Sequence, residues 1–151
     1  MAKVLEKLVE KLGEDSIVAE IEKSEETTVT ISFDSLGEQE EAVVVMSISK
    51  VPMEEIEDYS FYNIFSVVAV NIETEGMNQV LANVNELNME CLFGNYGVVV
   101  SDGILYHKQV VKIAKADESQ MADALYDGMV DVLALLDENY EASIKASMVS
   151  E

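Results

Sequence analysis

Thirty of the 151 residues are aspartate or glutamate, so carboxylates are the side chains most available for chemistry. A catalytic pair of carboxylates needs two environments that separate their pKa values, usually because one group is buried. Four of the adjacent acidic pairs are singled out because they lie in polar stretches, which favours a solvated surface over acid–base catalysis. These pairs are Glu25-Glu26, Glu40-Glu41, Glu54-Glu55 and Glu57-Asp58.

A regular row of aspartates, Asp123, Asp127 and Asp131, is expected along one face of a helix because each is four residues from the next. Such a row could attract cations weakly, but an ordinary polar helix face is the favoured interpretation. The chain has no calcium-binding loop, no His-Glu-x-x-His motif and no cluster of histidine and cysteine. The sequence therefore predicts no metal site and no cofactor.

The other candidates for catalysis are the single cysteine, Cys91, and the single histidine, His107. The apolar neighbours of Cys91 predict a buried thiol, whereas a reactive thiolate needs a histidine and a basic neighbourhood. His107 falls on a half-apolar strand, on the face of Leu105, Gln109 and Val111, where a structural role is expected. No serine lies in a Gly-x-Ser-x-Gly context. We therefore expect no catalytic residue and no enzyme activity.

The charge balance restricts the possible partners. Nine lysines, thirty acids and no arginine give a net charge of −21. Binding to nucleic acid needs clustered basic side chains, and arginine is the usual bidentate ligand of phosphate. Gly94, Gly97 and Gly103 flank predicted strands and open no helix, so they form no phosphate-binding loop. Nucleic acid, nucleotides and anionic membranes are disfavoured, while a basic or neutral protein partner fits the charge.

Helical spacing of apolar residues predicts a first helix over residues 3–12, which Gly13 ends. Alternation then predicts strands at 17–21, 27–33 and 42–49, the last two joined by a polar turn at 34–41. Pro52 ends this antiparallel meander because proline has no N–H for the ladder. An acidic loop or single helical turn follows at 54–58, and a longer strand is expected at 62–72.

The second half of the chain is expected to contain a helix from about Thr74, a β-hairpin and a long C-terminal helix. Asp102-Gly103 predicts a type I′ turn between strands at 94–101 and 104–113. Asp117 and Gln120 have the spacing of a capping box and mark the start of the last helix. Short connections favour antiparallel pairing, so the predicted fold is α+β: an antiparallel β-sheet with N-terminal, middle and long C-terminal helices.

Two predicted strands, 42–49 and 62–72, carry apolar residues on both faces. A sheet that helices cover on one side should be polar on the other, so this pattern predicts a further cover, either a second copy of the chain or a client protein. The alternative is that the first and last helices cover opposite faces. The candidate contact residues are Val43, Val45, Phe65 and Val67.

The segment from Asn85 to Asn88 ends a predicted helix and is followed by Gly94, an aliphatic strand, Asp102-Gly103, a second strand and an amphipathic helix. This arrangement resembles the YbjN family, whose fold is similar to that of the type III secretion chaperones. The element order is similar over nearly the whole chain, and the motifs over residues 84–140. The resemblance implies a secretion-chaperone-like fold, a homodimer and a role in binding protein. The alternating Lys/Glu first helix departs from the chaperones, whose first helix contacts the client.

A chain of 151 residues has the length of one domain, and no repeat or linker divides it, so a single domain over 1–151 is expected. The N-terminal residues lack the apolar core of a signal peptide, and the longest uncharged stretch, 59–72, is too short to cross a bilayer. These features predict a cytoplasmic protein without a membrane partner.

Taken together, these patterns favour a non-enzymatic protein-binding domain, chaperone-like or regulatory, that forms a homodimer or holds a segment of a partner protein on an apolar surface. Two alternatives stay open at the level of sequence. One is a small metal-dependent hydrolase that uses surface carboxylates. The other is a structural assembly subunit with one fixed, folded partner.

Overall fold

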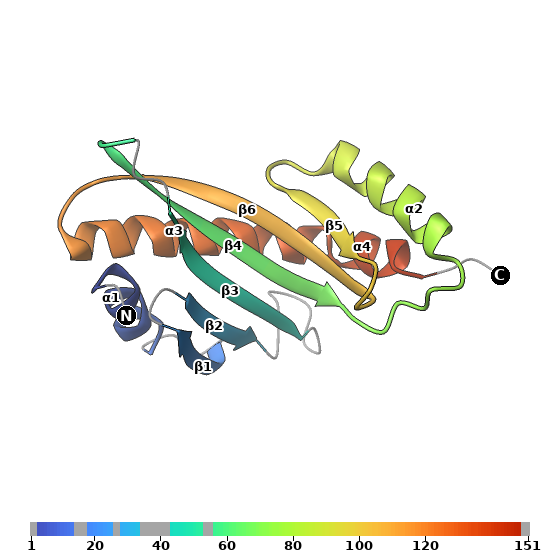
Figure 1. Cartoon of the computed structure of the whole chain (residues 1–151), viewed down its shortest axis with the longest axis horizontal. Helices are drawn as coiled ribbons and strands as arrows, with labels where there is room; N and C mark the ends of the chain where they lie inside the picture. The colour runs from blue at the N-terminus through green and yellow to red at the C-terminus, as the bar shows by residue number, and fades with distance from the viewer. Residues whose placement is uncertain (1–2, 14–17, 26–27, 34–42, 53–55, 149–151) are drawn as a thin grey trace.

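The computed structural model describes residues 3–13, 18–25, 28–33, 43–52 and 56–148 (Figure 1). Six strands form one sheet in the order β1-β2-β3-β4-β6-β5, and every neighbouring pair is antiparallel. The predicted α+β class is therefore confirmed. The strands are β1 (Val18–Glu25), β2 (Thr28–Phe33), β3 (Val44–Val51), β4 (Tyr59–Ala69), β5 (Asn95–Val99) and β6 (Ile104–Ala114).

Four helices accompany the sheet in the described part of the chain: α1 (Lys3–Leu12), α2 (Met77–Glu90), α3 (Glu118–Glu138) and α4 (Tyr140–Ala146). In Figure 1 the long helix α3 runs behind the sheet, with α1 near its beginning and α4 near its end. Within the described ranges, no helix is both long enough and apolar enough to span a membrane.

All four helices contribute to one hydrophobic core with a single face of the sheet. Along β4 every second residue is buried and the residues between are half-exposed, which is the pattern of a strand covered on one side. Helices α1 and α3 pack against each other, and Lys11 Nζ donates to Asp123 Oδ1 at 2.7 Å. The alternative that the first and last helices cover opposite faces is therefore wrong.

The start of α3 follows the predicted cap, since Asp117 Oδ1 accepts a hydrogen bond from Gln120 N at 2.9 Å. At its middle, Gly128 permits a close approach to β6, because a Cβ there would lie 3.1 Å from a methyl of Val111. The predicted long C-terminal helix is interrupted at Asn139, where φ is −95° and ψ is 5°. Asparagine favours helix ends over helix interiors, and Tyr140 accordingly begins the separate helix α4.

The predicted hairpin is present between β5 and β6, but the type I′ turn is wrong. Four residues, 100–103, connect the strands, and Gly103 alone among them has a positive φ, 63°. A type I′ turn requires two consecutive positive φ values, which Asp102 does not supply. Gly103 also accepts a hydrogen bond from Ile72 N at 3.0 Å, and a Cβ there would lie 2.5 Å from Ile72 O. This contact explains why the position needs glycine.

The strand predicted at 62–72 lies three residues earlier, at Tyr59–Ala69. It begins early because Tyr59 and Ser60 pair with the end of β6, and it stops before Asn71, whose φ of 61° is incompatible with a strand. Residue Ile17, the turn at 34–41 and the acids Glu54 and Glu55 lie outside the described residues.

Candidate functional site

The face of the sheet that the helices leave open has an apolar centre on β3, β4 and β6. Val45 pairs with Val67, which pairs with Tyr106, so three side chains form one row across the three strands. In the next row Phe65 stacks on Tyr106, with ring centroids 4.7 Å apart and an interplanar angle of 27°. All four side chains are half-exposed.

The structure thus brings together three of the four predicted contact residues, Val45, Phe65 and Val67. The fourth, Val43, directly precedes β3 and is 61% exposed. Tyr106 was missed, although it could have been found, because it alternates with Leu105 and His107 in a strand that was correctly predicted. The sequence does not show which strand lies beside β4, because the order of strands in the sheet does not follow from the local pattern of residues.

The open face carries different polar groups on its β2 side and on its β6 side. On the β2 side it carries hydroxyl groups, and Thr30 Oγ1 lies 3.5 Å from Ser47 Oγ. On the β6 side it carries Lys108 and Lys112, and the ammonium of Lys112 lies 4.0 Å from the ring centroid of Tyr59. Along β2 to β6, where the structure describes the outward side chains, none of them is a carboxylate. In a chain with thirty acids, this absence marks the face as distinct from the rest of the surface.

A hollow of about 350 Å³ lies near one end of this face. It forms where Asn63 of β4 stands between Ser49 of β3 and Val110 of β6, since these side chains are shorter than those of Phe61 and Phe65 in the flanking rows. The amide oxygen of Asn63 is buried and has no hydrogen-bond partner among the described residues. Asn63 lines the hollow together with apolar residues, Val51, Pro52, Phe61 and Val110, and polar ones, Ser49, Lys50 and Lys108. The Asn63 amide oxygen itself is enclosed and does not open into the hollow.

Cys91 and His107 are closer than the sequence indicated, with 3.8 Å between Sγ and Nε2. The carbonyl oxygen of Phe93 accepts from both, from Sγ at 3.1 Å and from Nε2 at 3.0 Å. Because Nε2 donates there, the imidazole cannot also take the thiol proton at that nitrogen. Burial raises the pKa of the Cys91 thiol and lowers the pKa of His107, so both groups are neutral rather than a thiolate–imidazolium pair. Cys91 is half-buried, not fully buried as expected.

His107 belongs to a polar row inside the core, because it pairs with Ser66 on one side and Tyr96 on the other. Ser66 Oγ, His107 Nδ1 and Tyr96 Oη are all buried without a hydrogen-bond partner among the described residues. Burial raises the pKa of Tyr96, and the nearby Asn139 side chain opposes that shift without reaching hydrogen-bonding geometry. Ser66 and His107 are both 0% exposed, so a substrate could reach this serine–histidine pair only by opening the core.

The carboxylates singled out in the sequence lie at the surface wherever the structure describes them. Glu57 and Asp58 are exposed, as are Asp123, Asp127 and Asp131 of α3. Throughout the described residues, no three histidine, cysteine or acidic side chains come together in a way that could hold a metal ion. The side chains of the pairs Glu25-Glu26, Glu40-Glu41 and Glu54-Glu55 are outside the described set.

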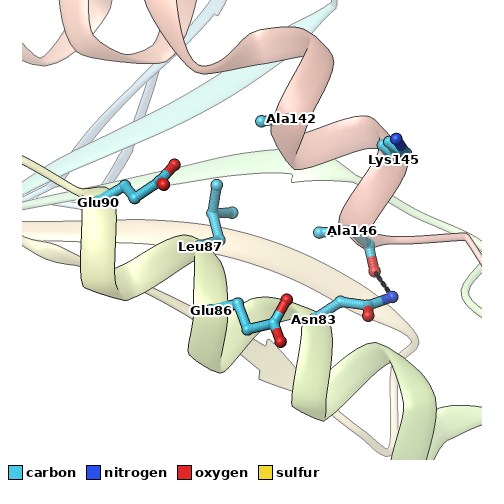
Figure 2. Close-up of a pocket in the computed structure, with 7 residues that line it drawn as sticks. All are labelled: Asn83, Glu86, Leu87, Glu90, Ala142, Lys145 and Ala146. Atoms are coloured by element: carbon cyan, nitrogen blue, oxygen red, sulfur yellow. Dashed lines mark hydrogen bonds between the residues drawn. The ribbon is translucent and has the colours of Figure 1, made fainter.

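A second depression, of about 300 Å³, separates α2 from α4 (Figure 2). Asn83 Nδ2 bridges the two helices by donating to Ala146 O at 3.3 Å. Figure 2 shows Leu87 pointing from α2 toward α4, with the carboxylates of Glu86 and Glu90 on either side. Leu87 is 8% exposed and belongs to the core, so this groove is the ordinary seam between two packed helices.

No known family model matches this chain, and no curated protein is significantly similar to it. The resemblance to the YbjN family and the type III secretion chaperones therefore stays a prediction based on element order and motif.

Proposed function

We propose that this protein is a non-enzymatic protein-binding domain, chaperone-like or regulatory, that holds a segment of a partner protein on the open face of its sheet. The observation that carries the proposal is the half-exposed row Val45–Val67–Tyr106, with Phe65 stacked beside it. Burying these side chains under a partner would remove apolar and aromatic area from water, which is the main source of affinity at protein interfaces.

The layout of the face also matches a protein interface in its composition. An apolar and aromatic centre lies between hydroxyl groups on one side and lysines on the other. Interfaces commonly have an apolar core that is depleted of charge and is surrounded by a polar rim. The same face could instead be covered by a second copy of the chain or by one fixed partner in an assembly, and the experiments below separate these occupants.

A peptide selection tests the proposal directly. A library of random dodecapeptides displayed on phage would be selected on the immobilised full chain and on Val67→Glu, which places a charge at the apolar centre. We expect peptides that the wild type retains and Val67→Glu loses, because a buried unpaired carboxylate opposes docking.

Val130→Glu is the matched control, since Val130 is an exposed valine of α3, 42% exposed, on the helical side of the molecule. This variant should retain the same peptides as the wild type. Enrichment of one peptide set by both variants, or of none by the wild type, would remove the support for binding at this face. Circular dichroism of both variants verifies that they are folded.

A further inference from the structure

We infer that the partner segment is acidic as well as apolar, with a carboxylate next to a large apolar side chain. This inference deepens the proposed function and rests on it. The net charge of −21 by itself favours a basic or neutral partner. At the site of contact, however, the charged side chains are lysines, which favour an acidic segment.

The lysines of the open face favour a carboxylate in the partner. Lys108 projects from the same face as Phe65, its neighbour across β4 and β6, and makes no ion pair with any described residue. Lys112 follows it on the same face of β6, over the ring of Tyr59. Among the described outward side chains of β2 to β6, these two lysines carry the only charges. Exposed charges farther away than about 8 Å are largely screened at physiological ionic strength. A carboxylate would pair with Lys108, whereas a basic side chain would be repelled by it.

The hollow around Asn63 favours a large apolar side chain next to that carboxylate. Its walls include Phe61, Val51 and Val110, together with Lys108 and Lys50. A volume of about 350 Å³ is enough for one large apolar side chain with some backbone. An occupant that fills the hollow would therefore bring its neighbouring residue to Lys108. This geometry places the apolar group and the carboxylate next to each other in the partner.

The amide oxygen of Asn63, which has no hydrogen-bond partner among the described residues, favours an N–H donor in the partner. A buried acceptor without a hydrogen-bond partner destabilises the folded protein. Because the oxygen is enclosed, the Asn63 amide must turn toward the hollow before a backbone N–H of the bound segment can donate to it, and this hydrogen bond would then recover the cost on binding. The three groups then specify a segment that donates one N–H to Asn63, inserts an apolar side chain beside Phe61 and presents a carboxylate to Lys108.

Fluorescence anisotropy with three labelled dodecapeptides tests the inference on the full chain. The first peptide alternates Leu or Phe with Asp or Glu, the second has Lys in place of every acid, and the third has Ser in place of every apolar residue. We expect the first peptide to bind most tightly. With Lys108→Gln its affinity should fall about three- to fivefold, the effect of one exposed ion pair, and become less sensitive to salt.

Lys145→Gln is the control for charge, because Lys145 is an exposed lysine of α4 that has no ion pair among the described residues. It should leave the affinity unchanged. Asn63→Leu tests the acceptor by two measurements that move in opposite directions. The variant should be at least as stable to urea as the wild type, since the unpaired oxygen is removed, yet it should bind the first peptide more weakly.

Tighter binding of the lysine peptide, or equal effects of Lys108→Gln and Lys145→Gln, would overturn the inference. If the acidic and lysine peptides bound equally and both were lost with Val67→Glu, the face would still bind protein and only the acidic preference would fail. If none of the three peptides bound and the phage selection found none, the proposed function itself would fail. Light scattering that shows a dimer, converted to a monomer by Val67→Glu, would assign the face to a second copy and also contradict the inference.

Discussion

Val44 and Val45 are neighbours in β3, yet one is 0% exposed in the core and the other is half-exposed on the open face. The same contrast separates Ile64 from Phe65 in β4 and His107 from Lys108 in β6. On the covered face, apolar side chains are fully enclosed by helices and account for the stability of the fold. On the open face, similar side chains remain in contact with water, where they contribute less to folding and stay available for binding.

The largest expected effect comes from the covered face. Ile64 is 0% exposed, and Ile64→Ala would leave a cavity between the sheet and the helices. We expect the free energy of unfolding to fall by about 3 kcal/mol, measured by urea denaturation with circular dichroism. A loss under 1 kcal/mol would show that Ile64 is not tightly packed, and would contradict the assignment of this face to the core.

A matched pair of substitutions compares the two faces directly. Val44→Thr replaces a buried methyl group by a hydroxyl without a partner and should destabilise the protein by about 2 kcal/mol. Val45→Thr makes the same change where the hydroxyl meets water and should alter stability by less than about 0.5 kcal/mol. Equal losses in urea denaturation would show that the open face is covered within the chain itself.

A smaller, pH-dependent effect is expected from His107. Burial lowers its pKa in the folded state below the ordinary 6.5, so between those two values the unfolded chain binds more protons than the folded one. The stability that neutral His107 supports is therefore complete above about pH 6.5 and is lost as the pH falls through that window.

His107→Gln removes this titration and retains a possible donor to the Phe93 carbonyl. The stability difference between wild type and variant should shrink as the pH is lowered from 7.5 to 5.5. At low pH the wild type takes up a proton at His107 when it unfolds, which favours its unfolded state, and the variant does not. Lys108→Gln, one residue away on the open face, should show a constant difference over this range. A difference for His107→Gln that did not change with pH would contradict a buried neutral imidazole.

Features that depend on neighbouring residues in the chain could be predicted from the sequence, whereas features that depend on distant contacts could not. Helix α1 and the cap at Asp117 were predicted because both depend on contacts within one turn. The hairpin was also predicted, but its turn type was wrong, since Gly103 is constrained by a distant contact with Ile72. The break at Asn139 was missed because asparagine is weakly unfavourable in helices and is often tolerated within them.

The candidate site was predicted only in part, for a similar reason. Alternation placed Val45, Phe65 and Val67 on one face of their own strands, which depends on the two-residue period alone. The proximity of Tyr106, Lys108 and Asn63 depends on β6 pairing with β4, and this pairing joins segments about forty-five residues apart in the chain. The contact between Cys91 and His107 arises from the β5–β6 hairpin, in which Tyr96 pairs with His107.

By itself, the sequence determined the class of fold, the absence of arginine and of any clustered metal-binding motif, and the presence of apolar residues on both faces of two strands. These properties depend on composition and on local periodicity, which every segment carries wherever it is placed. Only the tertiary structure determines which face of the sheet is covered. Helices α1 and α3 pack against each other on the same face and contribute to one core. It also decided that, among the described outward side chains of β2 to β6, lysines and hydroxyl groups rather than acids border the apolar centre. Side chains from separate strands share a surface only after the chain has folded.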